Sequence, residues 1–273
     1  MVDTVQVADI VSAAELLQAV VQPTPVLHFR LLEALTNRPV FLKCENLQRA
    51  GSFKIRGAFN RMAKLTEAEK VRGVVAASAG NHAQGVALAA QMLGIKAVIF
   101  MPADAPLPKV EATRAYGAEI RLGGRNVDEC LALARAEAQA SGRTLIHPFD
   151  HPDVVAGQGT LALEILEQVP DVETVIIPVG GGGLIAGIAT VFAERAPHVK
   201  VIGVQAENAA AYPESLIAHK PITRLPGATM ADGIAIGTPG LVPLEILSRL
   251  GVEVRTVSEV DMARALLALV ERA

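Results

Sequence analysis

Short apolar runs alternate with longer segments of helical periodicity along most of the chain. The short runs are rich in β-branched residues, as buried strands are, and the longer segments are rich in Ala and Leu, as helices are. Strands are predicted at residues 40–43, 73–77, 97–100, 119–122, 174–177 and 200–204. Helices are predicted at residues 52–64, 66–71, 81–93, 107–116, 127–140, 157–168, 183–196 and from 258 to the end. This alternation predicts an α/β fold with parallel sheets and right-handed crossovers, grouped into two lobes that meet near residues 147–152.

Composition narrows the class of protein. The 273 residues are 51% hydrophobic and 19% charged, with a mean hydropathy of +0.37, which excludes a disordered chain. No apolar run reaches the roughly 18 residues of a membrane span, and the N-terminus lacks the cationic start of a secretory signal. The net charge of −3 and 3% aromatic content argue against a nucleic-acid surface. Cys44 and Cys130 form neither a disulfide framework nor a zinc motif, so a cytoplasmic protein is expected.

A run of four glycines, Gly180–Gly183, lies between a predicted strand and an Ala-rich helix. Backbone N–H groups free of side chains, at the positive end of a helix, can bind a phosphate. The loop also matches the dinucleotide fingerprint G-x-G-x-x-A at Gly181, Gly183 and Ala186, with acidic Glu207 after the next strand. A nicotinamide-dependent oxidoreductase and a tight strand–helix connection therefore remain alternatives for this motif.

Lys54 lies in the segment Gly51–Gly57, in the first turn of a helix that Ser52 is predicted to cap. The partial positive charge of the helix end and burial both lower the pKa of an amine placed there. A lysine with a depressed pKa is what imine chemistry requires. Taken alone, however, this motif fits an ordinary exposed helix lysine better, and only the other motifs favour the activated one.

The segment Ser78–His82 forms a third turn between a strand and a helix. Its backbone N–H groups can bind a carboxylate, and the Asn81 amide can bond a phenolic oxygen, unless Asn81 serves only as a helix cap. We interpret His82 as a structural hydrogen-bonding residue, without a catalytic role. The histidines show no metal-binding spacing, and no metal site is expected.

Together, a phosphate-binding loop, an activated lysine and a carboxylate-binding turn indicate pyridoxal 5'-phosphate chemistry on an amino acid. A dehydrogenase would explain only the first of these three motifs.

The motifs also resemble one family. The segments are E-N-L-Q-R-A-G-S-F-K-I-R-G-A from Glu45, S-A-G-N-H-A-Q-G from Ser78, A-G-Q-G-T from Ala156, P-V-G-G-G-G-L-I-A-G from Pro178 and M-A-D-G from Met230. They are similar to those of fold-type II pyridoxal-phosphate enzymes, and more narrowly of the short, catabolic-type threonine dehydratases (threonine ammonia-lyases), from about residue 8 onward.

The resemblance implies a two-lobed, tryptophan synthase β-like fold. Its large, cofactor-binding domain would comprise residues 1–66 and 149–273, and its small domain residues 67–148. The family continues with a Gly-Ala-rich helix and a Ser-Gly-Gly-Asn turn that this sequence does not contain. The large domain is therefore expected to be incomplete at its C-terminal end.

The resemblance also assigns roles to residues. Lys54 would join the cofactor as an imine and move the Cα proton, while Phe53 packs beside the ring, Asn81 bonds the ring hydroxyl and the Gly233 backbone lines the pocket. The cofactor phosphate would be bound by Gly180, Gly181, Gly182, Gly183 and Leu184. The substrate carboxylate would be bound by Ser78, Ala79, Gly80, Asn81 and His82.

The implied reaction converts L-threonine to 2-oxobutanoate and ammonia, with L-serine giving pyruvate, in threonine catabolism or isoleucine biosynthesis. A small amino acid is the expected partner, and a homo-dimer or homo-tetramer the expected assembly. Ala79 stands where racemases of this fold place a proton-transferring serine, which favours elimination. Gln205 and Ala211 replace the acids of the racemase metal site. Serine racemisation, β-replacement and a remnant without turnover remain alternatives.

Overall fold

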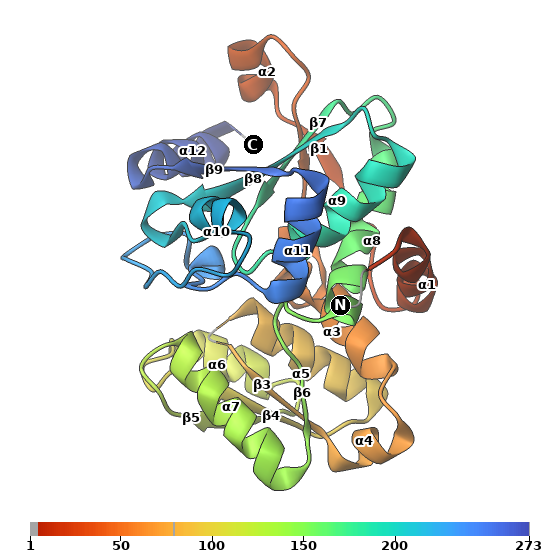
Figure 1. The fold of residues 1–273 in the computed structure, drawn as a ribbon, viewed down its shortest axis with the longest axis vertical. Helices are drawn as coiled ribbons and strands as arrows, with labels where there is room; N and C mark the ends of the chain where they lie inside the picture. The colour runs from red at the N-terminus through yellow and green to blue at the C-terminus, as the bar shows by residue number, and fades with distance from the viewer. Residues whose placement is uncertain (1–4, 79, 273) are drawn as a thin grey trace.

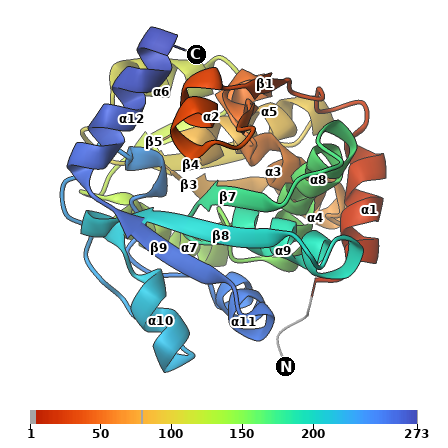
Figure 2. The same ribbon diagram turned by 90° about the horizontal axis from the view of Figure 1, so that it is seen from above.

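The computed structural model describes residues 5–78 and 80–272. Within these ranges the elements form two groups, each built on its own parallel sheet (Figure 1). The four-stranded group has the strand order β5-β4-β3-β6 and the three-stranded group the order β7-β8-β9. Figure 2 shows β7, β8 and β9 side by side in sequence order. The predicted α/β fold with parallel sheets is therefore confirmed.

The strands are β1 (Val26–His28), β2 (Phe41–Lys43), β3 (Val74–Ala77), β4 (Ala97–Met101), β5 (Glu119–Leu122), β6 (Thr144–Leu145), β7 (Thr174–Pro178), β8 (Lys200–Ala206) and β9 (Glu253–Val257). The four-stranded group includes α4 (Glu67–Arg72), α5 (Asn81–Leu93), α6 (Leu107–Arg114) and α7 (Val127–Ser141). The three-stranded group includes α8 (Pro152–Gln168), α9 (Gly183–Arg195), α10 (Tyr212–Ala218), α11 (Leu241–Leu250) and α12 (Glu259–Arg272). The N-terminal part contributes α1 (Val7–Leu17), α2 (Arg30–Thr36) and α3 (Lys54–Ala63), and β1 pairs antiparallel with β2.

Two helix starts differ from the sequence prediction for local reasons. Helix α8 begins at Pro152 instead of residue 157, because the His151 side chain accepts the N–H of Asp153 and proline suits a first helical position. Helix α3 begins at Lys54, with Phe53 at the N-cap position. The Ser52 hydroxyl still accepts the N–H of Lys54, at 3.4 Å.

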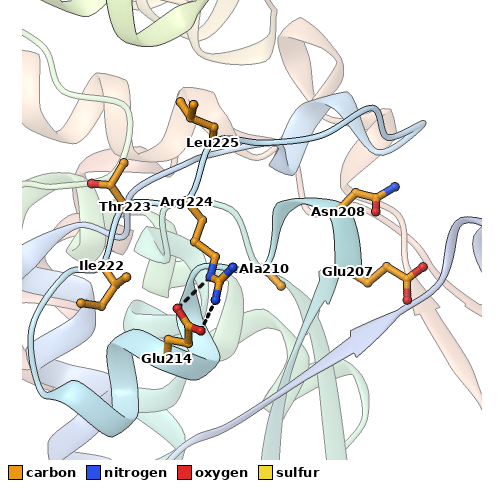
Figure 3. A pocket seen from close by; sticks show the side chains of 8 residues that line it. All are labelled: Glu207, Asn208, Ala210, Glu214, Ile222, Thr223, Arg224 and Leu225. Atoms are coloured by element: carbon orange, nitrogen blue, oxygen red, sulfur yellow. Dashed lines mark hydrogen bonds and ion pairs between the residues drawn. The ribbon is translucent and has the colours of Figure 1, made fainter.

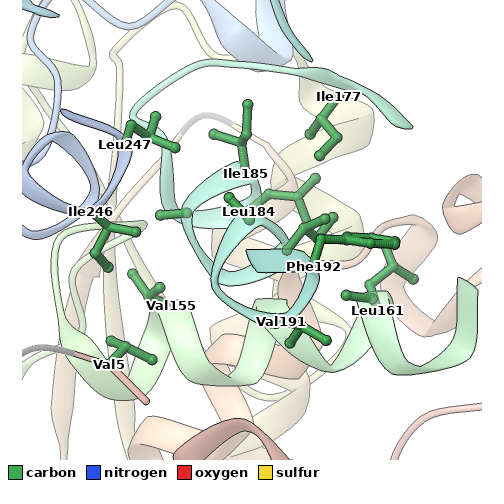
Figure 4. Close-up of a cluster of buried hydrophobic side chains, with 14 of the residues drawn as sticks. Val5, Val155, Leu161, Ile177, Leu184, Ile185, Val191, Phe192, Ile246 and Leu247 are labelled. Carbon is green, nitrogen blue, oxygen red and sulfur yellow. The ribbon is translucent and has the colours of Figure 1, made fainter. Parts of the chain in front are cut away.

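The two groups have separate hydrophobic cores. In the three-stranded group, α9 is buried along one continuous stretch, Gly183–Phe192, because it lies between the sheet and the helices α8 and α11 (Figure 4). In the four-stranded group, α5 packs on β3 and β4. Helix α3 contacts both α5 and α8, so it lies between the groups. No helix within the described ranges has the length and apolar character needed to span a membrane.

Helices α8 and α9 approach closely at two glycines. A Cβ atom added to Gly187 would lie 2.4 Å from the Val155 carbonyl oxygen and 2.6 Å from the Gly159 nitrogen. Both atoms belong to backbone, so a side chain there can be accommodated only by moving one helix.

We expect Gly187→Ala to lower the free energy of unfolding by about 1–3 kcal/mol through this overpacking. Urea denaturation monitored by circular dichroism measures the loss. Gly123→Ala is the control, because its nearest neighbour, the Leu133 side chain, is 3.4 Å away. Equal denaturation midpoints for the two variants would contradict the expectation.

Candidate active site

Lys54 is the first residue of α3, and its side chain is half-buried. Its Nζ donates a hydrogen bond to the Pro148 carbonyl oxygen at 2.9 Å and lies 5.4 Å from the centre of the Phe53 ring. Burial lowers the pKa of the Lys54 amine to about 8. Neutral amine, the nucleophilic form, is therefore accessible near physiological pH.

The residue after Pro148 connects this amine to the glycine loop. A Cβ atom added to Gly181 would lie 2.2 Å from the Phe149 ring, and one added to Gly183 would lie 3.1 Å from the Phe149 Cα. The Phe149 side chain thus packs directly on the loop, while the carbonyl of Pro148 binds Lys54. Lys54 and Gly180 are 126 residues apart in the sequence. The lysine motif and the glycine motif nevertheless both contact the segment Pro148–Phe149.

The glycine loop has the form of an anion site. The Gly181 carbonyl accepts hydrogen bonds from the Tyr212 hydroxyl and from the N–H of Gly240, both at 3.1 Å. Gly182 has φ +94°, and a Cβ atom on it would lie 1.8 Å from the Tyr212 hydroxyl. Among the described residues, no hydrogen-bond acceptor is paired with the N–H groups of Gly181, Gly182, Gly183 and Leu184. These donors, at the positive end of the 13-residue helix α9, fit a phosphate group.

The start of α5 also approaches Lys54. A Cβ atom added to Gly85, in the second turn of α5, would lie 3.1 Å from the Lys54 carbonyl carbon, so the starts of α5 and α3 are packed together. Asn81 is exposed and is the first helical residue, while Gly80 occupies the N-cap position, so the Asn81 side chain does not cap the helix. The N–H of Gly80 donates to the Ser78 hydroxyl at 3.1 Å. Ala79 lies outside the described residues.

Two histidines near Lys54, the buried His82 and the half-buried His147, have lowered pKa values. His82 donates from Nε2 to the Ile146 carbonyl at 2.9 Å, and burial together with the charge of Lys54 lowers its pKa to about 3. This hydrogen bond agrees with the structural role predicted for His82. His147 accepts the N–H of Asp150 at Nδ1, and burial lowers its pKa to about 4.

The segment around Gly233 lies over the glycine loop. A Cβ atom added to Gly180 would lie 3.2 Å from the Ile234 Cα. Gly233 itself is exposed, in the 3-10 helix η4 (Asp232–Ile234), and its Cβ direction is open. The structure therefore places the backbone next to Gly233 beside the glycine loop, and both were expected to line the cofactor pocket.

A buried ion-pair network holds the start of α3. The Arg56 side chain is fully buried, and its guanidinium contacts both Glu45 carboxylate oxygens at 3.0 Å and Glu164 at 2.6 Å. Lys43 binds the other Glu164 oxygen at 2.5 Å. The network joins β2, the 3-10 helix η1 (Glu45–Leu47), α3 and α8 around the residue two positions after Lys54.

Sequence reasoning missed several residues that build the site. Glu45 and Arg56 lie within the lysine motif. Opposite charges beside a buried helix could have predicted their ion pair. Pro148 and Phe149 stood in the segment interpreted only as a boundary. No sequence pattern indicated that Tyr212 would bind the glycine loop.

A cavity of about 370 Å³ lies elsewhere and shares no lining residue with this site (Figure 3). Arg224 forms an ion pair with Glu214 across it. Its wall includes Glu207, the acidic residue of the dinucleotide alternative. The cavity is lined by Glu207, Asn208, Ala210, Glu214, Ile222, Thr223, Arg224 and Leu225.

Comparison with known proteins identifies the family. The family model described as "Pyridoxal-phosphate dependent enzyme" matches residues 17–273. The L-threonine ammonia-lyase of Thermotoga maritima is 48% identical over 266 residues, which cover 97% of this chain and 66% of the relative. The catabolic L-threonine dehydratase TdcB of Escherichia coli K12 is 44% identical, with 98% of this chain and 82% of the relative covered. The chain thus spans between 63% and 66% of the length of two curated ammonia-lyases that it matches.

Solved structures agree with this result. Threonine deaminase isoform 2 from Solanum lycopersicum superposes with a TM-score of 0.93 at 35% identity, over 100% of this chain and 82% of that one. Maize serine racemase superposes with a TM-score of 0.94 at 34% identity, over 99% and 82% of the two chains. The predicted resemblance to fold-type II enzymes is confirmed.

We expect Lys54 of the cofactor-free protein to react with acetic anhydride at a rate that is half-maximal near pH 8, because the neutral amine is the reactive form. Peptide mass spectrometry over a pH series measures the rate at Lys54, and Lys64, which directly follows the same helix, controls for reagent decay. A rate at Lys54 that keeps rising beyond pH 10 would contradict a burial-depressed pKa.

Proposed function

The chain belongs to the pyridoxal-phosphate dependent enzyme family, and we propose on that premise that it converts L-threonine to 2-oxobutanoate and ammonia. L-Serine would give pyruvate in the same way. One observation carries the proposal: the half-buried Lys54 amine binds the Pro148 carbonyl, and the glycine loop packs against the next residue, Phe149. An amine and an anion site in this relation suit a small phosphorylated aldehyde.

The residues present fit that cofactor. The loop from Gly180 to Leu184 would hold its phosphate, Lys54 would hold its aldehyde carbon, and Phe53 would pack beside its ring. Asn81, exposed at the start of α5, would bond the ring hydroxyl. When bound, the cofactor supplies an electron sink for negative charge at the substrate Cα.

The chain's own groups would then carry out the steps. The Ser78–His82 turn binds the carboxylate and so fixes the Cα–H bond toward Lys54. The neutral form of the Lys54 amine, which its lowered pKa of about 8 makes more abundant, accepts the Cα proton. The β-hydroxyl leaves with a proton as water, and a later water releases ammonia, so that threonine gives 2-oxobutanoate and ammonia in balance. The pKa values of His82 and His147, lowered to about 3 and about 4, make both weaker bases than Lys54.

Several wider assignments belong to the same proposal. Residues 1–66 and 149–273 would form the large domain and residues 67–148 the small one. The amino acid would be the partner, in a cytoplasmic homo-dimer or homo-tetramer. The hydrophobic core of the three-stranded group supports this division in part, because Val5 and Ile10 pack in it together with buried residues between 155 and 247. Ile55, Phe59 and Met62 of α3 pack instead in the core of the four-stranded group.

Serine racemisation is a second candidate, because maize serine racemase superposes well on this chain. Racemisation needs a proton donor on the face of Cα opposite the lysine. The sequence has Ala79, which cannot transfer a proton, at the position where racemases of this fold place a serine. Elimination is therefore the preferred function.

We expect borohydride reduction of the protein with pyridoxal phosphate to label Lys54 covalently, and L-threonine to yield 2-oxobutanoate. The Lys54→Ala variant should not be labelled. Its turnover should fall at least about 10²-fold, because the substitution removes the proton-transferring amine. Peptide mapping and a coupled keto-acid assay measure the two effects. Lys64→Ala is the matched control, and a label at Lys64 in place of Lys54 would refute the assignment.

With L-serine as substrate, pyruvate is expected without D-serine, because only one face of Cα carries a proton-transferring group. Chiral chromatography of the reaction mixture distinguishes the products. Accumulation of D-serine ahead of pyruvate would favour the racemase alternative.

A further inference from the structure

An ion pair spans the two groups on the side of the candidate site. Lys109 of α6 binds Asp232 of η4, with Nζ and Oδ2 2.6 Å apart. Within the described part of the chain, no other hydrogen bond or ion pair joins residues 67–147 to residues 174–272. The polar connection across this face therefore depends on two side chains.

The pair lies at the rim of the site. A Cβ atom added to Gly80 would have one neighbour within 4 Å, the Lys109 amine at 3.9 Å. On the other side, Asp232 precedes Ile234 by two residues, and the Ile234 Cα is in contact distance of Gly180. The ion pair thus links the predicted carboxylate-binding turn to the predicted phosphate-binding loop.

Resting on the proposed function, we propose that Lys109 is a positioning residue for amino-acid binding. Its ion pair with Asp232 holds the Ser78–His82 turn against the glycine loop, so that carboxylate and phosphate sites keep their spacing. The two side chains are 38% and 74% exposed, and pairs this exposed contribute little to global stability.

The test compares single and double variants of the full chain. Lys109→Met and Asp232→Asn should each raise KM for L-threonine about three- to fivefold with kcat nearly unchanged, the scale set by one exposed pair. The double variant Lys109→Asp with Asp232→Lys restores the pair in reverse and should return KM toward the original value. The matched controls are Arg114→Met and Glu111→Gln, which break an exposed ion pair within α6 that does not join the groups.

Hydrogen–deuterium exchange supplies a readout that needs neither cofactor nor turnover. Amides of residues 80–84 and 232–236 should exchange faster in both single variants than in the original chain and the double variant. Equal exchange in all four proteins would overturn the inference. A raised KM in Lys109→Met alone, with Asp232→Asn unchanged or improved, would also overturn it, because Lys109 would then attract the substrate directly. Absence of turnover in the original chain would count against the proposed function, whereas the exchange comparison would still decide the role of the pair.

Discussion

The buried guanidinium of Arg56 is the constraint on which the site depends. It lies in α3, the helix shared by both groups, and charge cannot remain there without partners. Glu45 and Glu164 satisfy it from two different elements, so the start of α3 has one low-energy position. Lys54 precedes Arg56 by two residues in the same helix, so the contacts that fix Arg56 also fix the backbone of Lys54. A buried network of this kind adds little net stability compared with apolar packing, yet losing one partner would leave an uncompensated charge.

The site combines this anchored amine with an electrostatic environment that keeps nearby groups neutral. His82 and His147 are both held in one tautomer by backbone groups and have strongly lowered pKa values. Burial acts on Lys54 in the same direction, because desolvation disfavours every cation. The fixed positive character is instead provided by backbone N–H groups at the start of α9, which cannot be titrated. An amine that titrates near pH 8 and a permanent anion site therefore coexist in one site.

Much of this arrangement was predictable from the sequence, and the exceptions have physical causes. Helix α5 occupies its predicted residues, because a glycine turn and a terminal glycine limit it. The start of α8 was missed, because its cap is a histidine followed by proline instead of a common capping residue. The short strand β6 has only two residues and no periodicity of its own; its pairing with β3 creates it. The residues of the motifs could be recognised from the sequence. The distance between Lys54 and the glycine loop could not be predicted, because it depends on how the Pro148–Phe149 segment runs between them.

The contact between Phe149 and Gly181 has a consequence for how relatives of this chain can diverge. The aromatic ring fills the volume that any side chain at position 181 would need. The two positions are therefore not free to vary one at a time: a larger residue at 181 becomes accessible only after the ring has been replaced by something smaller. Position 149 must therefore change before position 181 can accept a larger residue. Paired substitutions at the two positions would be tolerated where the single substitution at position 181 is not.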